Sequence, residues 1–182
     1  MYIVKVQVEG VEELQKKLNS LKGKMKRHHR VLQRAGIFLK SDIRENFESM
    51  GSHWGVNWAP LSETTKKIKK ALGYGNKPPM VRTGALKEGF VYQIQDSTGK
   101  GVMEVYNIMP YFVKHQSSNS VDRRIFPASV TKDGKVYVKR NAEMMPLPRR
   151  VMLKLTKDAA EEIKAQYKMW VLEKIKDTFG DV

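Results

Sequence analysis

The stretch FVYQIQDSTGKGVMEVYNI, residues 90–108, decides the fold class of this chain. Apolar and polar residues alternate over residues 90–95, which is the period of a half-buried strand. Residues 96–100 are rich in turn formers, and a second apolar stretch runs from Val102 to Ile108. The pattern predicts a β-hairpin in a chain whose longest periodic segments are helical.

Helical periodicity precedes the hairpin. Apolar residues recur at steps of three and four from Val11 to Phe47, which predicts one long helix or two. Gly23 and Gly36 are weak points, because glycine inside a helix costs up to ~1 kcal/mol relative to alanine. Gly23 lies in a lysine-rich run and is a candidate for a kink.

A further amphipathic helix is predicted near the end of the sequence. It opens at Thr156 or Asp158 and ends near Phe179, with Gly180 behind it. Its apolar face consists of Ile163, Tyr167, Trp170, Val171 and Ile175.

Shorter elements complete the predicted fold. We expect a strand over residues 2–8, a helix over Glu63–Leu72 with Ser62 as its N-cap, and a hairpin turn at Asp133-Gly134. The sequence therefore predicts one α+β domain over residues 1–182. A small antiparallel sheet is flanked by a long N-terminal helix, kinked or split, and by the C-terminal amphipathic helix. The basic segment 119–145 is expected to be a hairpin arm or loop elaboration.

Composition narrows the classes of function. The 182 residues include 34 Lys and Arg against 19 Asp and Glu, which gives a net charge of +15. Cysteine is absent, so disulfides, thiol nucleophiles and cysteine metal sites are excluded. The N-terminus has no signal-peptide pattern, and no apolar run approaches the ~18 residues that a membrane span needs. We expect a protein that is made in the cytoplasm and does not enter a membrane.

Motifs for catalysis are missing. The sequence has no Gly-x-Ser-x-Gly elbow and no phosphate-binding Gly-x-x-x-x-Gly-Lys-Ser/Thr loop. His28 and His29 are adjacent and would point about 100° apart on a helix, which does not suit a shared metal. Asp42 and Glu45 are best explained as part of a solvated helix face. The sequence therefore predicts no enzyme, no cofactor and no metal.

The positive charge leaves a nucleic-acid-binding module open as an alternative. Basic residues near tyrosines can follow a phosphate backbone, although no recognised DNA- or RNA-binding motif is present. An acidic protein partner would select the same charge. The candidate contacts to a partner or a nucleic acid are Arg123, Arg124, Lys132, Lys135, Lys139 and Arg140.

Four short elements in a fixed order carry a family resemblance. They are Trp58-Ala59-Pro60-Leu61-Ser62-x-x-Thr65, Met80-Val81-Arg82-Thr83-Gly84-Ala85-Leu86, Tyr111-Phe112-Val113-Lys114-His115-Gln116 and Leu147-Pro148-Arg149-Arg150. In this order the chain resembles the phage virion morphogenesis family, the tail-completion or head–tail joining proteins of tailed phages, including Mu-like ones. The matching residues are Trp58, Pro60, Leu61, Thr65, Thr83, Gly84, Leu86, Tyr111, His115, Gln116, Pro148 and Arg150.

The resemblance implies a structural virion protein of the phage neck or tail end. Such a protein would form a ring of about six copies that completes the tail and joins it to the head. Its partners would be itself and other neck, connector or tail-tube proteins, with packaged DNA as a further contact. The ring copies would meet through the long N-terminal helix and the 119–145 segment.

Structural roles are expected for the motif residues. Trp58 and Leu61 should seal their loop to the core, and Thr83 should cap a helix that begins after the flexible Gly84. His115 is expected to be a hydrogen-bonded structural residue rather than a ligand.

Overall fold

The computed structural model of the chain describes residues 10–97, 99–116, 124–125, 128–130, 136–138, 143–144 and 148–180. The described residues divide into two compact units. The first unit takes them from Met1–Ile37, Gln93–Glu104 and Lys157–Val182, and the second unit from Phe38–Tyr92 and Val105–Thr156. The strand predicted over residues 2–8 lies outside the described residues.

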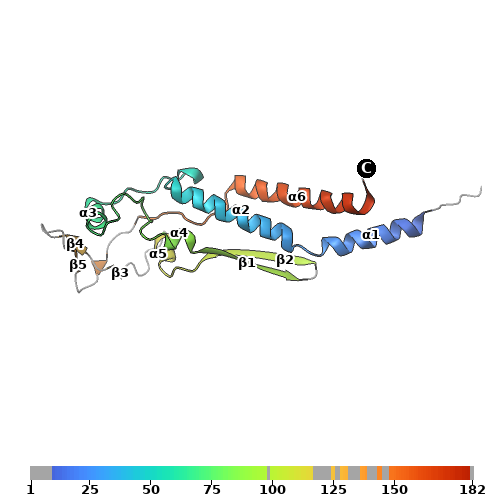
Figure 1. Ribbon diagram of the computed structural model, residues 1–182, viewed down its shortest axis with the longest axis horizontal. Helices are drawn as coiled ribbons and strands as arrows, with labels where there is room; N and C mark the ends of the chain where they lie inside the picture. The colour runs from blue at the N-terminus through green and yellow to red at the C-terminus, as the bar shows by residue number, and fades with distance from the viewer. Residues whose placement is uncertain are drawn as a thin grey trace, which may run out of the picture. The chain divides into compact units, whose positions relative to one another are not determined.

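The chain is α+β, as predicted (Figure 1). Its helices are α1 (Val11–Met25), α2 (His29–Glu48), the 3₁₀ turn η1 (Ser52–Trp54), α3 (Glu63–Ala71), α4 (Ala85–Glu88), α5 (Phe112–Gln116) and α6 (Lys157–Phe179). Its strands are β1 (Phe90–Ser97), β2 (Lys100–Asn107), β3 (Arg124–Ile125), β4 (Ala128–Val130), β5 (Val136–Val138) and β6 (Glu143–Met144). Strands β1 and β2 form the hairpin that the alternation over 90–108 predicts.

In the first unit the long N-terminal helix is split in two. Helix α1 packs on α6 and runs through Gly23 without interruption. The predicted break lies instead at the end of the lysine-rich run that contains Gly23. The chain leaves α1 at Lys26 and begins α2 at His29. At this break the ring of His28 stacks on Tyr167 and lies 5.7 Å from the ring of Trp170, which is buried. Aromatic packing at His28 therefore marks the break better than glycine does.

A side chain of the β1–β2 hairpin caps the N-terminus of α2 in the same unit. The backbone N–H of His29 donates to the carboxylate of Asp96, at 2.8 Å. A carboxylate at a helix N-terminus satisfies an unpaired donor and interacts favourably with the helix dipole. Gly101 faces the same corner, because a Cβ on it would lie 2.7 Å from the Leu32 side chain and 2.8 Å from that of His28.

The second unit contains the main hydrophobic core. Seven buried side chains form it: Ile43, Phe47, Trp54, Trp58, Leu86, Phe90 and Met152. The rings of Phe47 and Trp58 meet edge to face with centroids 5.1 Å apart, and Phe47 and Phe90 meet at 6.0 Å. Trp58 is only 6% exposed, which confirms that it seals its loop to the core.

Two short strand pairs lie in the basic segment. Strand β4 pairs antiparallel with β5, and Ser129 stands opposite Tyr137. Strand β3 pairs antiparallel with β6. The β4–β5 pairing agrees with the hairpin predicted around Asp133-Gly134, although residues 131–135 themselves lie outside the described part.

Among the described residues, no helix combines the length and the apolar character that crossing a membrane requires.

Candidate docking pocket

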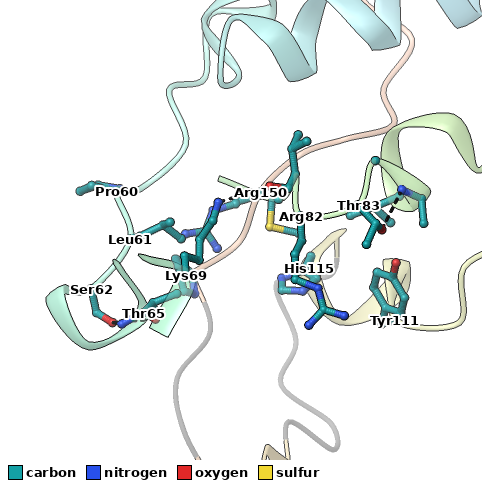
Figure 2. A pocket seen from close by; sticks show the side chains of 16 residues that line it. Pro60, Leu61, Ser62, Thr65, Lys69, Arg82, Thr83, Tyr111, His115 and Arg150 are labelled. Atoms are coloured by element: carbon teal, nitrogen blue, oxygen red, sulfur yellow. Dashed lines mark hydrogen bonds between the residues drawn. The ribbon is translucent and has the colours of Figure 1, made fainter. Parts of the chain in front are cut away.

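A cavity of about 730 Å³ opens in the second unit, and we call it the α3–α4 pocket (Figure 2). It is lined by parts of α3, α4 and α5, by the loops before α3 and α4, and by the chain at 148–150. The described lining residues are Pro60, Leu61, Ser62, Thr65, Lys69, Met80, Val81, Arg82, Thr83, Gly84, Ala85, Leu86, Tyr111, His115, Pro148 and Arg150.

The residues that carry the family resemblance meet in this pocket. All of them except Trp58 and Gln116 belong to its lining, although they come from four separate stretches of sequence. The sequence alone gave them individual structural roles and did not predict a shared cavity. Their convergence makes the α3–α4 pocket the candidate functional site.

Trp58 and Gln116 hold the wall behind the pocket. The chain at residues 149–153, which we call the clamp segment, is neither helix nor strand, so side chains satisfy part of its backbone. The Gln116 amide accepts from Met152 N at 2.7 Å and donates to Leu153 O at 2.7 Å. Trp58 Nε1 donates to Val151 O at 3.1 Å. The two motif residues outside the lining therefore fix the segment that carries Arg150.

Arg150 is a buried cation in the pocket wall. Its residue is 4% exposed, and its guanidinium donates to the carbonyl of Ala59 at 2.9 Å. Its Nε is buried without a hydrogen-bond partner, and burial lowers the pKa of Arg150. None of the described residues lining the pocket is acidic. A buried guanidinium with an unused donor favours an incoming anion.

His115 lies beside Arg150 in the same wall. Its backbone carbonyl accepts from Arg150 N at 2.9 Å, but its ring Nδ1 is buried without a partner. His115 is therefore hydrogen-bonded through its backbone carbonyl and not through its ring Nδ1. Burial, and then the charge of Arg150, lower the pKa of His115.

We expect His115 to make the protein less stable as the pH falls below about 6.5. Its ordinary pKa is about 6.5, and the folded value is lower, so the unfolded chain binds a proton first as pH falls through about 6.5. The free energy of unfolding, measured by chemical denaturation, should therefore decrease between about pH 7.5 and about pH 5.5. The decrease should be larger in the wild type than in the His115→Gln variant. Equal losses in the two proteins would mean that His115 is not buried in its neutral form.

Lys69 closes one side of the pocket. Its ammonium donates to the carbonyls of Lys77, Pro78 and Val81, at 2.6, 2.9 and 3.3 Å. Burial, followed by the charge of Lys77, lowers the pKa of Lys69. These bonds tie α3 to the loop that bears Met80, whose φ of 63° is uncommon for a residue with a side chain. The loop is thus held in a conformation that it would not favour alone.

The local sequence explains how α3 and α4 begin at the rim. Ser62 accepts from Thr65 N at 3.2 Å, which confirms the predicted N-cap of α3. For α4 the N-cap position is Gly84 at φ 94°, and Thr83 Oγ1 accepts from Ala85 N at 3.4 Å. The N-cap is therefore Gly84 rather than the predicted Thr83, which stands one residue before it and contributes only a weak bond.

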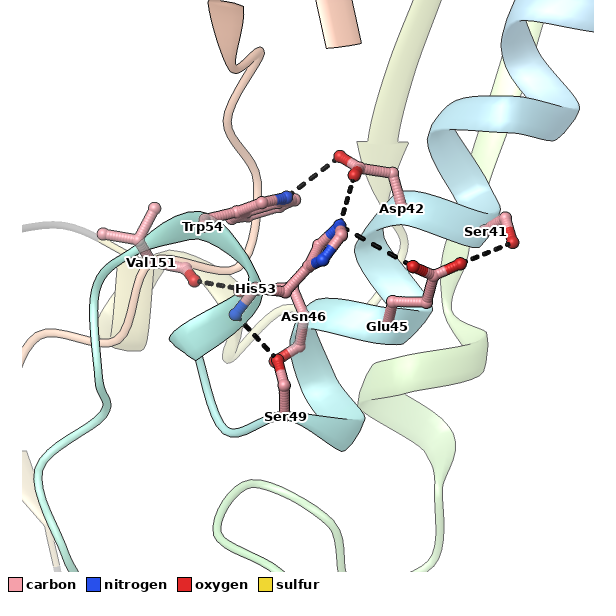
Figure 3. Close-up of polar contacts among 8 residues, drawn as sticks. All are labelled: Ser41, Asp42, Glu45, Asn46, Ser49, His53, Trp54 and Val151. Carbon is pink, nitrogen blue, oxygen red and sulfur yellow. Dashed lines mark hydrogen bonds and ion pairs between the residues drawn. The ribbon is translucent and has the colours of Figure 1, made fainter. Parts of the chain in front are cut away.

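A second polar cluster lies outside the pocket, in the core of the same unit (Figure 3). Asp42 is 8% exposed, so its assignment to a solvated helix face is wrong. Its carboxylate accepts from His53 Nε2 at 2.6 Å and from Trp54 Nε1 at 2.9 Å. Asn46, one turn further along α2, donates to Val151 O at 3.1 Å. The cluster fastens the loop after α2 and the clamp segment, which is a structural role.

Sequence reasoning did not predict every residue that lines the pocket, and most of the candidate partner contacts lie outside the described residues. Met80 and Arg82 belong to one of the resembling elements, and Lys69 belongs to the lysine-rich helix, but none of the three was among the matching residues or the candidate contacts. Among the candidate partner contacts, Arg124 belongs to β3. Arg123, Lys132, Lys135, Lys139 and Arg140 lie outside the described residues. Within the described residues, no cluster of histidine and carboxylate side chains is suited to a metal ion.

Comparisons with known proteins do not add a family. No profile of a known protein family, no curated protein and no solved structure matches the chain significantly.

Proposed function

We propose that the chain is a structural protein of the phage neck or tail end, which assembles with copies of itself and helps to complete the tail and join it to the head. The observation that carries the proposal is the convergence of the resembling elements. Residues of all four elements line one pocket of the second unit, as expected if the elements were kept together by one structural requirement.

The contacts of these residues support a structural role. Trp58 and Gln116 bond the backbone of the clamp segment, and Arg150 bonds the carbonyl of Ala59. These interactions join segments that are far apart in sequence and form no arrangement of nucleophile, base and oxyanion donor. We infer that function resides in surfaces that contact other chains, and a closed ring is the assembly that head-to-tail contacts give when the rotation closes.

The proposed location is tested by counting the protein in particles. Peptide mass spectrometry of purified virions, with isotope-labelled standards, should find the chain at about six copies per particle. A major capsid or tail-tube protein in the same sample provides the calibration. Particles that lack the chain but are otherwise complete would contradict a role as a virion component.

A nucleic-acid-binding module is the second candidate, and the net charge of +15 favours it. Such a module would bind duplex DNA with an affinity that falls steeply with salt, because phosphate contacts release counterions. A fluorescence titration at low and physiological salt measures this. Absence of binding at low salt would eliminate the candidate, whereas site-specific binding that survives physiological salt would favour it over the neck protein.

A further inference from the structure

The α3–α4 pocket combines positive charge with apolar walls. Four of its lining side chains are basic or histidine, namely Lys69, Arg82, His115 and Arg150, and Figure 2 shows them gathered around its centre. Leu61, Met80, Val81 and Leu86 supply apolar surface. Its volume of about 730 Å³ lies within the usual range for ligand-binding pockets.

The cations in the pocket are not equally free to bind. The hydrogen bonds of Lys69 to three carbonyls use its donors, so Lys69 contributes charge rather than a new bond. Arg150 keeps a buried Nε without a partner. Arg82 is exposed, and its guanidinium lies 5.9 Å from the centre of the Tyr74 ring. Arg150 at depth and Arg82 at the rim are therefore the two groups available to an anion.

We propose that the α3–α4 pocket binds an acidic segment of another protein chain, with a glutamate or aspartate side chain reaching Arg150 and a neighbouring apolar side chain packing on Leu61 and Met80. The proposal goes beyond the proposed function, because it names the chemistry of a partner and does not depend on the assembly to which that partner belongs.

The depth of Arg150 favours a protein segment over a nucleic acid. A residue that is 4% exposed is reached only by a thin group on a flexible stem, which describes a carboxylate side chain. A duplex phosphate is fixed in a stiff backbone and is read on exposed surfaces. The apolar walls give a second reason, because a phosphate backbone carries no apolar side chain to cover Leu61 and Met80, whereas peptide recognition commonly pairs a charge with an apolar anchor.

The test is an NMR titration of the full chain with two capped peptides that differ in a single side chain. The acidic peptide has a glutamate between two leucines, and its match has glutamine in that place. The acidic peptide should shift the Arg150 Nε–H and His115 ring signals. It should also bind about tenfold or more tightly than its match, because glutamine offers Arg150 a neutral acceptor in place of a charged one.

Variants locate the binding without disturbing the core. Arg82→Gln should weaken binding of the acidic peptide about threefold or more, since an exposed cation at the rim is removed. Arg44→Gln is the matched control: Arg44 is an exposed arginine of the same unit that pairs with Glu88 outside the pocket, so its loss should leave binding unchanged.

Three outcomes would overturn the proposal. Equal binding of the two peptides would show that the carboxylate is not recognised. Absence of shifts at millimolar peptide would show that the pocket does not bind such peptides. A short DNA duplex that shifts the Arg150 signal when the acidic peptide does not would assign the pocket to nucleic acid. The titration uses the isolated chain, so a negative result leaves the neck role standing and a positive one does not establish it.

Discussion

Replacing Phe47 with alanine is expected to lower the free energy of unfolding by about 3–5 kcal/mol. Phe47 is fully buried, and its ring contacts those of Trp58 and Phe90 at the centre of the second unit. Removing it takes away buried apolar surface and leaves a cavity between two aromatic rings that cannot both move into the space. Chemical denaturation followed by tryptophan fluorescence measures the loss.

The control for Phe47→Ala comes from the same helix. Ile37 also lies in α2 but is 57% exposed, so Ile37→Ala should cost less than about 1 kcal/mol. Similar losses for the two variants would contradict the assignment of the core to the Phe47 face of α2.

Replacing Gly51 with alanine is expected to lower the free energy of unfolding by about 3 kcal/mol or more. Gly51 lies in the turn after α2, at the N-cap position of η1, and its φ of 92° disfavours a side chain. A Cβ there would also collide with the carbonyl oxygen of Val56 and lie 2.5 Å from Trp58 Cδ1. Trp58 would have to move, and its bond to Val151 O in the clamp segment would be lost with it.

The same loop provides a matched glycine. Gly55 has φ of 69°, but a Cβ on it would meet nothing within 4 Å. Gly55→Ala should therefore cost only the backbone term, about 1 kcal/mol. The two alanine variants are compared by denaturation and by near-UV circular dichroism, which reports tryptophan packing. A loss at Gly51 no larger than at Gly55 would show that the close approach of Trp58 does not constrain the loop.

Sequence patterns predicted the elements that are determined by interactions among neighbouring residues. The alternation over 90–108 predicted the β1–β2 hairpin, and Ser62 predicted the start of α3. The period of α6 placed Trp170 on its apolar face, where it is buried. In each case neighbouring residues supply most of the determining interactions, so a window of sequence contains the necessary information.

The features that the sequence did not predict depend on distant contacts. The sequence predicted a kink or split in the long N-terminal helix but not its exact position, which follows from His29 N bonding Asp96 and from His28 packing on α6. The burial of Asp42 follows from partners on the loop after α2, which no helical periodicity reveals. One signal was present, because Asp42 and Asn46 border the apolar positions Ile43 and Phe47 on α2. Polar residues at the edge of an apolar stripe often have specific buried partners.

The α3–α4 pocket also depends on contacts between distant segments, which the sequence does not reveal. The resembling elements were visible individually, but the order of segments along the chain does not say which of them meet. Gln116 and Arg150 are brought together by the clamp segment, a stretch without regular secondary structure that side-chain hydrogen bonds hold in place. Such a segment has no periodicity from which its position could be read.

The proposed role in the phage neck or tail end is tested most directly by electron microscopy. If the proposal holds, the sample is a lysate of the phage in which this gene has been disrupted, with a plasmid-borne copy of the gene as control. DNA-filled heads beside unjoined or abnormally long tails are expected, and the plasmid-borne copy should restore normal particles. Infectious particles of normal form from the disrupted phage would contradict a role in completing the tail or joining it to the head.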